Sequence, residues 1–221
     1  MRDTVEKAWS DVVATARRTV ADGLVVGTSG NVSARVGDLV LVTPTGVPYD
    51  RLGPDDAVAV DLADGRQVRG TLRPTSELPM HLAVYRATAA RAIVHTHAPH
   101  ATAVSTLVGE LPLIHYMAAA LGGPVLVAGY ALYGSDALAH EVLAALRDGR
   151  TGCLMRNHGT LTHGGTLDEA YDRTAQLEWM CRVWLLARPA GAASEPHTLS
   201  QQELDQVAEK LRGYGQDAPP V

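Results

Sequence analysis

The spacing of apolar residues along the chain predicts a succession of helices. In residues 4–22 the apolar side chains fall on one side of a helix, and Gly23 follows them as a C-terminal stop. That apolar side is formed by Val5, Ala8, Trp9, Val12 and Val13. Helical patterns recur over residues 76–88, 135–148, 167–187 and 200–212. We expect Ser76 and Ser135 to act as N-caps of the helices that they open.

Short apolar runs between these helices predict strands. They occupy residues 39–42, 57–62, 67–69, 92–96, 125–128 and 152–155. The second and third runs flank an Ala-Asp-Gly turn, which indicates a hairpin. Mixed helices and strands indicate a layered α/β or α+β domain with a largely antiparallel sheet. A length of 221 residues favours one compact domain over two small ones.

One stretch, residues 111–135, contains no Asp, Glu, Lys or Arg and could be long enough to cross a bilayer. It is interrupted by Gly122, Gly123 and Pro124, and four polar aromatic residues are spread along it: His115, Tyr116, Tyr130 and Tyr133. We therefore expect a buried helix followed by a strand, and no membrane partner.

Composition narrows the classes of function. The formal net charge is -5 and no run of Lys or Arg exceeds two residues, so the basic stripe of a nucleic-acid-binding protein is missing. The only cysteines, Cys153 and Cys181, fall in a predicted strand and a predicted helix, which argues against a disulfide framework. The first residues carry charges throughout and lack the apolar core of a signal peptide. We expect a cytoplasmic protein.

The sharpest chemical feature is a pair of histidines, His95 and His97, two residues apart on a predicted strand. Side chains at this spacing project from the same face, which suits metal chelation, although such a pair also occurs as satisfied polar residues at a strand end. His158 follows an apolar run, and Glu77 lies at a helix start. Zinc commonly takes three protein ligands and keeps a further position open. Spacing alone cannot show that Glu77, His95 and His158 meet.

Three other segments combine small residues, hydroxyls and flexible backbone: residues 27–31, 43–46 and 74–77. Exposed backbone N–H groups in such segments can converge on phosphate oxygens, and a helix N-terminus after Ser76 would favour an anion. Each segment taken alone is equally an ordinary turn. The first lacks the spacings of a P-loop or a dinucleotide fingerprint, so no nucleotide cofactor is indicated.

Seven segments in order closely resemble the class II aldolase and adducin family, in particular its L-fuculose-1-phosphate aldolases. They are GTSGNVSAR, TPTGVPYD, PTSELPMHLAVY, VHTHAPHATAVS, IHYMAAA, NHGTLT and KLRGYG. The resemblance covers nearly the whole chain. It implies a single α/β domain over residues 1–221 with a central antiparallel sheet flanked by helices, and a C-terminal linker and helix at 188–221 near the active site. It also implies a homotetramer with active sites at subunit interfaces.

By motif position, the resemblance implies that His95, His97 and His158 bind Zn²⁺, or alternatively Mn²⁺ or Co²⁺. Glu77 would be a fourth ligand and the acid/base, and Tyr116 of a neighbouring subunit would protonate the oxygen of the aldehyde half. The residues implied at the substrate phosphate are Thr28, Ser29, Asn31, Thr45, Gly46, Thr75 and Ser76. Those implied at the aldehyde pocket are Tyr133 and Tyr214.

The implied reaction is the reversible cleavage of a ketose 1-phosphate to dihydroxyacetone phosphate and a small aldehyde. No motif places a lysine for a Schiff base. The chief rival is L-ribulose-5-phosphate 4-epimerase, which typically has Asp at the position of Glu77 and a Thr-His-Ala-Asp segment where this chain reads LPLIHYMAAA. Further alternatives are salvage enzymes acting on 5-deoxypentulose or methylthioribulose phosphates. Non-catalytic scaffolds of this fold have lost the metal ligands that this chain retains.

Three departures from the family pattern are visible. Thr75 stands where Ser is usual, and Asn157 precedes His158 where another His is common. Neither change disturbs the implied mechanism. Tyr133 replaces an aromatic residue without a hydroxyl, which leaves the identity of the aldehyde half open.

Overall fold

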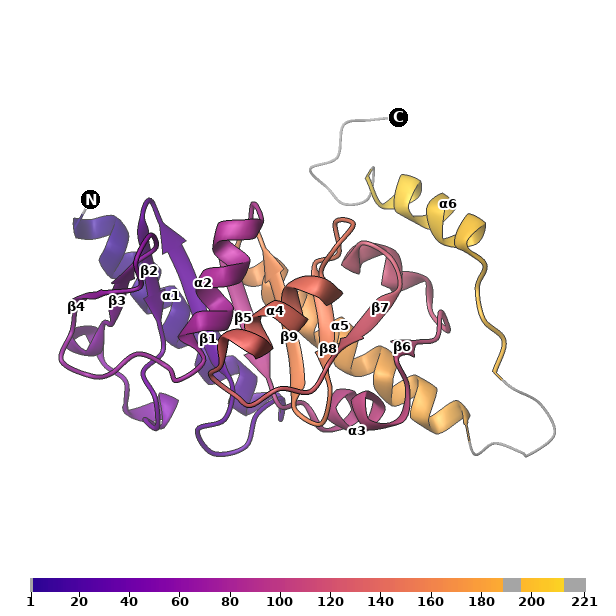
Figure 1. Cartoon of the computed structure of the whole chain (residues 1–221), viewed down its shortest axis with the longest axis horizontal. Helices are drawn as coiled ribbons and strands as arrows, with labels where there is room; N and C mark the ends of the chain where they lie inside the picture. Colours follow the sequence, from indigo (N-terminus) through magenta and orange to yellow (C-terminus); the bar gives the residue numbers. More distant parts are fainter. Residues whose placement is uncertain (1, 189–195, 213–221) are drawn as a thin grey trace.

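A computed structural model describes residues 2–188 and 196–212. Within this part of the chain, the strands form one nine-stranded sheet in the order β4-β3-β2-β1-β5-β9-β8-β7-β6 (Figure 1). Their bounds are β1 Asn31–Val36, β2 Leu39–Val42, β3 Ala59–Asp61, β4 Gln67–Arg69, β5 Ala92–Thr96, β6 Glu110–Leu111, β7 Val125–Ala128, β8 Gly152–Met155 and β9 Gly159–Gly164. Among the strands of residues 2–188 and 196–212, only β7 and β8 pair in parallel, so the prediction of an α/β domain with a largely antiparallel sheet is confirmed.

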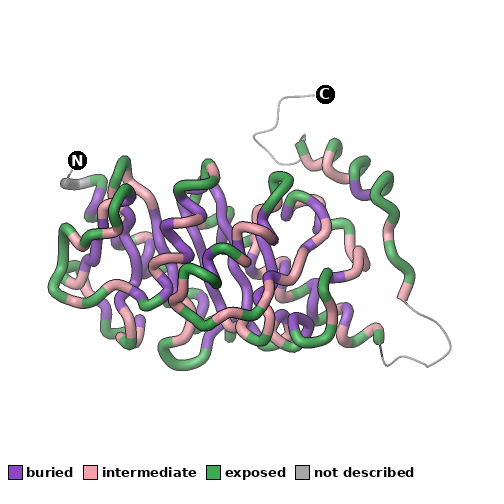
Figure 2. The backbone as a smooth tube through the Cα atoms, viewed as in Figure 1, coloured by how far each residue is buried: buried purple, intermediate pink, exposed green. Residues whose placement is uncertain are grey.

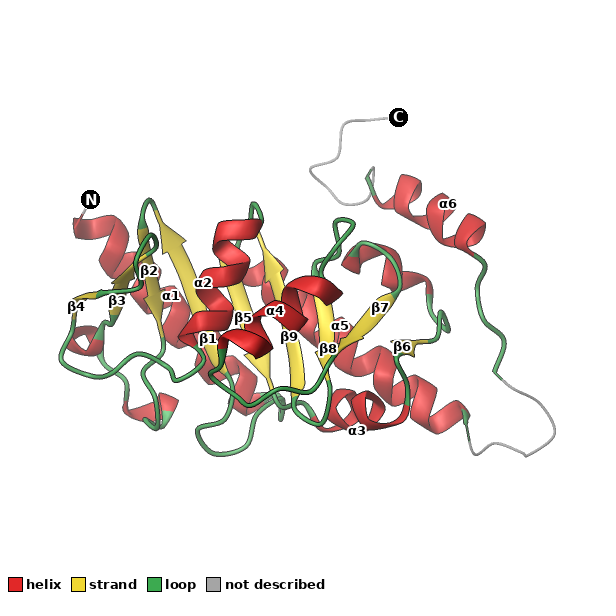
Figure 3. Cartoon of the chain, in the orientation of Figure 1, coloured by secondary structure: helices red, strands yellow, loops and turns green. Residues whose placement is uncertain are grey.

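Helices cover both faces of the sheet (Figure 3). The α-helices are α1 Arg2–Ala21, α2 Leu78–Ala87, α3 Pro99–Leu107, α4 Asp136–Ala145, α5 Leu167–Ala187 and α6 Gln201–Leu211. Helices α1, α3 and α5 pack on one face, and α2 and α4 on the other. The central strand β5 therefore buries Val94 against one layer and Ile93 against the other, which explains its uninterrupted apolar run. Figure 2 shows that the buried residues are concentrated along the strands in the middle of the sheet.

The predicted helix caps have different outcomes. Ser135 does cap α4, because its side chain accepts a hydrogen bond from the backbone N–H of Leu138. The prediction for Ser76 is wrong. Helix α2 begins one residue later, with Glu77 at the N-cap position and no side-chain cap. The hydroxyl of Thr75 accepts a hydrogen bond from the backbone N–H of Glu77 at 3.2 Å, and the carbonyl of Thr75 accepts one from the N–H of Leu78 at 3.2 Å.

Several elements are absent from the sequence-based prediction: β1, α3, β6 and β9. Strand β9 lacks an apolar run, so the sequence pattern does not predict it. Its polar residues Thr160 and Thr162 are nevertheless fully buried. The hydroxyl of Thr162 donates to the carbonyl of Ala170 at 2.7 Å, so a tertiary contact satisfies what looks like a surface residue. The helix expected within residues 111–135 is the short 3-10 helix η3 (Tyr116–Leu121), which ends at Gly122 with a left-handed φ of 85°.

Two negative expectations can be compared with the described ranges. Cys153 in β8 and Cys181 in α5 are both buried and free. No helix in residues 2–188 or 196–212 combines the length and the apolar composition needed to span a membrane.

Candidate metal centre and active site

Four side chains meet where β5 ends and α2 begins. His95 lies in β5, opposite Asn31 of β1 and Leu161 of β9. His97 follows two residues later on the same face. The first residue before α2 is Glu77, and the turn joining β8 to β9 contributes His158. The end of β5, the β8–β9 turn and the start of α2 thus bring their side chains together in one cluster.

Close backbone contacts make this convergence possible. A Cβ on Gly159 would lie 2.0 Å from the carbonyl oxygen of Thr96, so only glycine lets the β8–β9 turn approach the end of β5. In the same turn, Asn157 adopts a left-handed φ of 54°. The residue that follows it is His158, whose backbone N–H donates to the carbonyl of Met155 at 3.0 Å. The tight turn therefore delivers the His158 ring toward His95 and His97.

The three imidazoles surround a common centre at nearly equal separations. Their ring centroids lie 5.0 Å apart for His95 and His97, 4.9 Å for His95 and His158, and 4.7 Å for His97 and His158. Each residue, with Glu77, offers one ligand atom within 4.8 Å of the others. Ligands at about 2.1 Å from a tetrahedral zinc ion stand roughly 3.4 Å apart. The observed 3.1 Å between the Nε2 atoms of His95 and His97 is close to that spacing.

Hydrogen bonding shows that the cluster has a surplus of lone pairs. The Nδ1–H of His95 donates to the carbonyl of Thr160 at 2.7 Å, so the other ring nitrogen, Nε2, faces the cluster. That nitrogen lies 2.9 Å from Oε2 of Glu77. The second carboxylate oxygen, Oε1, is buried and accepts no hydrogen bond from any described residue; it lies 3.4 Å from Nε2 of His158. Nitrogen and carboxylate donors in this arrangement fit a zinc-like divalent ion.

The ionisation of the cluster also favours a cation. Burial alone would raise the pKa of Glu77, but the charge and hydrogen bond of His95, followed by His158 and Asn31, outweigh burial and hold this pKa well below its usual range. Burial would lower the pKa of His95, yet the Glu77 carboxylate raises it above the ordinary value. Burial, then the charge of His95, lowers the pKa of His97 to about 3 and that of His158 to about 4. Both rings are therefore neutral at pH 7 and can act as ligands.

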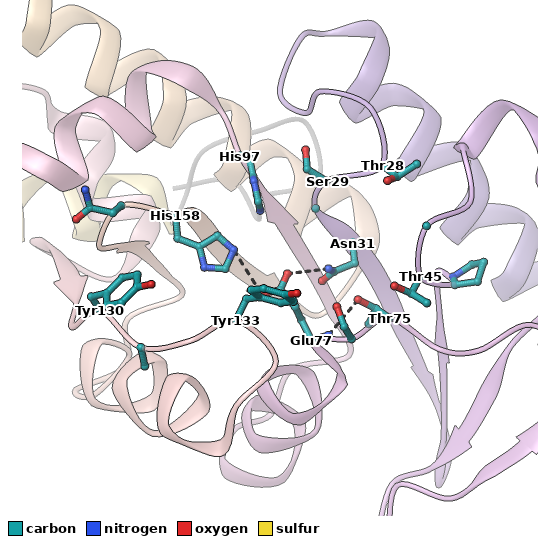
Figure 4. A pocket seen from close by; sticks show the side chains of 16 residues that line it. Thr28, Ser29, Asn31, Thr45, Thr75, Glu77, His97, Tyr130, Tyr133 and His158 are labelled. Atoms are coloured by element: carbon teal, nitrogen blue, oxygen red, sulfur yellow. Dashed lines mark hydrogen bonds and ion pairs between the residues drawn. The ribbon is translucent and has the colours of Figure 1, made fainter.

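A cavity of about 380 Å³ opens over this cluster (Figure 4). It is lined by Glu77, His97 and His158, while His95 is fully buried beneath them. All the residues predicted to bind phosphate line the same cavity: Thr28, Ser29, Asn31, Thr45, Gly46, Thr75 and Ser76. The three hydroxyl-bearing segments, far apart in sequence, are thus brought together beside the histidines.

Aromatic residues also line the cavity. Tyr130 and Tyr133, which belong to one loop, are both among its lining residues (Figure 4). Sequence reasoning noted Tyr130 only as a polar interruption, although its spacing from Tyr133 in one loop was a usable signal. Asn157 also lines the cavity and was noted only as a departure from the family pattern. Both tyrosines are largely exposed, at 70% and 64%.

Tyr116 is not among the residues that line this cavity in its own chain. Tyr116 is half exposed in η3, with its ring 4.4 Å from that of His115. It lines a separate groove with Trp179 of α5 and Leu211 of α6. Tyr214 lies outside the described residues. The described part of the C-terminal segment is held by a hydrogen bond from the N–H of Leu199 to the carbonyl of Leu113, and α6 packs on η3.

The chain is similar to known proteins in both sequence and structure. The family described as Class II Aldolase and Adducin N-terminal domain matches residues 10–185. The chain is 39% identical to L-fuculose phosphate aldolase of Escherichia coli K12 over 196 residues, 87% of this chain and 88% of that protein. It is 33% identical to 5-deoxy-D-ribulose 1-phosphate aldolase of Bacillus thuringiensis serovar kurstaki over 215 residues, 96% of this chain and 99% of that protein. A solved L-fuculose 1-phosphate aldolase superposes with a TM-score of 0.88 at 32% identity, covering 93% of this chain and 96% of that one.

The chain therefore belongs to the class II aldolase and adducin family, and the resemblance seen in its motifs is confirmed. Since the relatives are aldolases, the protein is an enzyme of the lyase class. Class II aldolases depend on a metal ion, and the group formed by Glu77, His95, His97 and His158 could hold one.

Proposed function

We propose that the protein reversibly cleaves a ketose 1-phosphate to dihydroxyacetone phosphate and a small aldehyde, with a zinc-like ion held by His95, His97, His158 and Glu77. The observation that carries this proposal is the shared cavity. One wall has a ligand set for a divalent metal, and the adjoining wall has three hydroxyl-bearing loops suited to a phosphate. A phosphorylated substrate with its reacting carbons at the metal requires this pairing.

When bound, the metal ion supplies Lewis-acid stabilisation of the negative charge that develops as the carbon–carbon bond breaks. The hydroxyls and backbone around Ser29, Thr45 and Ser76 bind the phosphate. These contacts lie away from the reacting bond and position the substrate for the reaction. Glu77 is ionised and can accept a proton at its carboxylate. In the synthetic direction we assign it the proton removed from dihydroxyacetone phosphate.

We also propose that each active site is shared between chains of a homotetramer. Tyr116 is half exposed and is not among the residues that line the cavity of its own chain. If it protonates the oxygen of the aldehyde half, it must do so in a neighbouring chain. The placement of residues 188–221 near an active site remains a prediction, as do the cytoplasmic location and the absence of nucleic-acid and membrane partners.

The aldehyde half is the least determined part of the substrate. L-Fuculose 1-phosphate and 5-deoxy-D-ribulose 1-phosphate share the phosphorylated half and differ in the aldehyde that they release. Tyr130 and Tyr133 line the same cavity as the hydroxyl-bearing loops (Figure 4), and we assign them to the aldehyde half. Tyr214 remains a predicted member of this pocket. We therefore state the substrate as a ketose 1-phosphate with a small, uncharged aldehyde portion.

The test is a panel of phosphorylated ketoses with coupled detection of dihydroxyacetone phosphate. The panel comprises L-fuculose, 5-deoxy-D-ribulose and methylthioribulose 1-phosphates and L-ribulose 5-phosphate. We expect dihydroxyacetone phosphate from at least one 1-phosphate, and none with Glu77→Gln. Formation of D-xylulose 5-phosphate from the 5-phosphate would instead identify an epimerase. Loss of water from methylthioribulose 1-phosphate without dihydroxyacetone phosphate would identify a dehydratase.

A further inference from the structure

A row of buried polar side chains runs from Glu77 through Asn31, His81 and Ser33 to Tyr85. Asn31 Nδ2 donates to Oε2 of Glu77 at 3.0 Å. The other end of the Asn31 amide, Oδ1, lies 2.5 Å from Nε2 of His81. Nδ1 of His81 lies 2.7 Å from the hydroxyl of Ser33, which in turn lies 2.7 Å from the hydroxyl of Tyr85. The row thus joins β1 to α2 beneath the cavity.

The direction of every hydrogen bond in this row follows from the Asn31 amide. Nδ2 of Asn31, which can only donate, faces Oε2 of Glu77, so the carbonyl oxygen Oδ1, which can only accept, faces His81. Nε2 of His81 must then carry the hydrogen, which leaves Nδ1 as an acceptor. Ser33 therefore donates to Nδ1, and Tyr85 donates to Ser33. All four bonds point from Tyr85 toward Glu77.

Burial keeps this arrangement uncharged. His81 and Ser33 are fully buried, and Tyr85 is 1% exposed. Burial, and then the charge of His95, lowers the pKa of His81 to about 3, so its ring is neutral at pH 7. Burial likewise raises the pKa of Tyr85 far above its usual range, which keeps the phenol as a donor. A neutral ring with one defined tautomer can hold its neighbours in one orientation only.

We propose that His81 is a positioning residue, which fixes the Asn31 amide so that its N–H groups face Glu77 and the cavity. A flipped amide would set its carbonyl oxygen against Oε2 of Glu77, two acceptors with no hydrogen between them. The Nε2–H of His81 prevents this flip. Because Asn31 lines the cavity, its second N–H remains available to a substrate oxygen. The inference rests on the proposed function only in taking this cavity as the active site.

The first test reads the tautomer of His81 directly. Long-range proton–nitrogen correlation on the full chain with ¹⁵N-labelled histidine distinguishes the Nε2–H form, the Nδ1–H form and the imidazolium. The His81 signals are assigned by their loss in His81→Gln. We expect a neutral Nε2–H ring throughout the working pH range of the wild type. An Nδ1–H ring or an imidazolium would overturn the proposal, whatever reaction the enzyme performs.

The second test removes the hydroxyl that holds the tautomer. In Ser33→Ala, Nδ1 of His81 loses its donor, so we expect a mixture of tautomers and a fall in zinc affinity or kcat/KM of about tenfold to a hundredfold, the usual effect of removing a partner behind a metal ligand. Thr174→Val is the matched control. It removes a buried hydroxyl from the pair that Thr174 forms with Thr162 at 2.6 Å on the opposite face of the sheet. This control should lose stability without changing the His81 tautomer, zinc affinity or kcat/KM.

Equal zinc affinity and kcat/KM in Ser33→Ala and Thr174→Val would overturn the positioning role. If Ser33→Ala does not fold, the wild-type tautomer still decides the proposal. Failure of the proposed function is separate: a wild type that cleaves no ketose 1-phosphate leaves the tautomer and the zinc affinity as valid readouts.

Discussion

The two sides of Glu77 differ in how their polar atoms are satisfied. On the cavity side, potential metal ligands crowd together: Nε2 of His95 lies 3.1 Å from Nε2 of His97, and Oε1 of Glu77 accepts no hydrogen bond within the described residues. On the far side, each donor meets an acceptor along the row through Asn31 and His81. The first side attracts a cation, whereas the second holds the carboxylate in place.

Histidine serves on both sides, and its surroundings decide its role. His81 uses both ring nitrogens in neutral hydrogen bonds, so no lone pair is left for a metal. His95 uses one nitrogen for the carbonyl of Thr160 and turns the other to the cluster. A buried histidine with one uncommitted nitrogen among others of its kind therefore indicates a ligand, and one with both nitrogens bonded indicates support.

Removing a ligand from the cavity side should have the largest effect. We expect about one zinc-like ion per wild-type chain, and we expect His95→Ala to lose both the metal and the activity, by roughly a thousandfold or more, since Lewis-acid stabilisation is worth several kcal/mol. Elemental analysis and turnover measure this. His140→Ala, an exposed histidine on α4, is the control. Wild-type protein with no transition metal and no activation by added zinc, manganese or cobalt would refute the metal centre.

The carboxylate between the two sides should matter more for chemistry than for metal retention. In Glu77→Gln three imidazoles remain to hold the ion, but the acid/base is gone, so turnover should fall about a hundredfold to ten-thousandfold while most of the metal stays. Metal content and single-turnover rates separate the two effects. The exposed Glu110→Gln serves as the matched control. Undiminished turnover in Glu77→Gln would make this residue structural.

The shared-site proposal predicts complementation between defective chains. Tyr116→Phe should lose about a hundredfold in turnover, because it removes the proton donor for the aldehyde half. When Glu77→Gln and Tyr116→Phe chains are co-assembled, some sites regain one intact Glu77 and one intact Tyr116, so activity should exceed that of the separate variants. Turnover after subunit exchange is the measurement. Mixed oligomers without added activity, or a fully active wild-type monomer, would rule out sharing.

The smallest effect concerns pH and the proton on His95. Its pKa is raised, so below that value a metal ion must displace a proton from Nε2, and the affinity should weaken about tenfold for each unit that pH falls. Above the raised pKa, the affinity should level off. The pKa of His97 is lowered to about 3 and that of His158 to about 4, so their protonation does not change the metal affinity at neutral pH. Zinc titrations across pH test this, and Glu77→Gln should move the onset to lower pH. A flat profile would contradict the assigned proton.

Much of the fold was predictable because its signals are local. The apolar periods of α1 and α5 and the runs of β5 and β8 follow from side-chain spacing alone. The polar strand β9 was not predictable, because the hydroxyl of Thr162 is hydrogen-bonded to partners on α5 that no local pattern reveals. The Ser76 cap failed because the backbone N–H of Leu78 donates to the carbonyl of Thr75, and Pro79 has no N–H to donate.

For the site, the sequence by itself determined that His95 and His97 share one strand face, since side chains alternate along a strand. It also determined which loops have the small residues and hydroxyls that a phosphate needs. Only the tertiary structure decided that His158 and Glu77 complete the cluster, because antiparallel pairing of β1, β5 and β9 and the close approach of Gly159 bring distant segments within hydrogen-bonding distance. The role of His81 likewise depends on Ser33 from β1, which no spacing along the chain could place beside it.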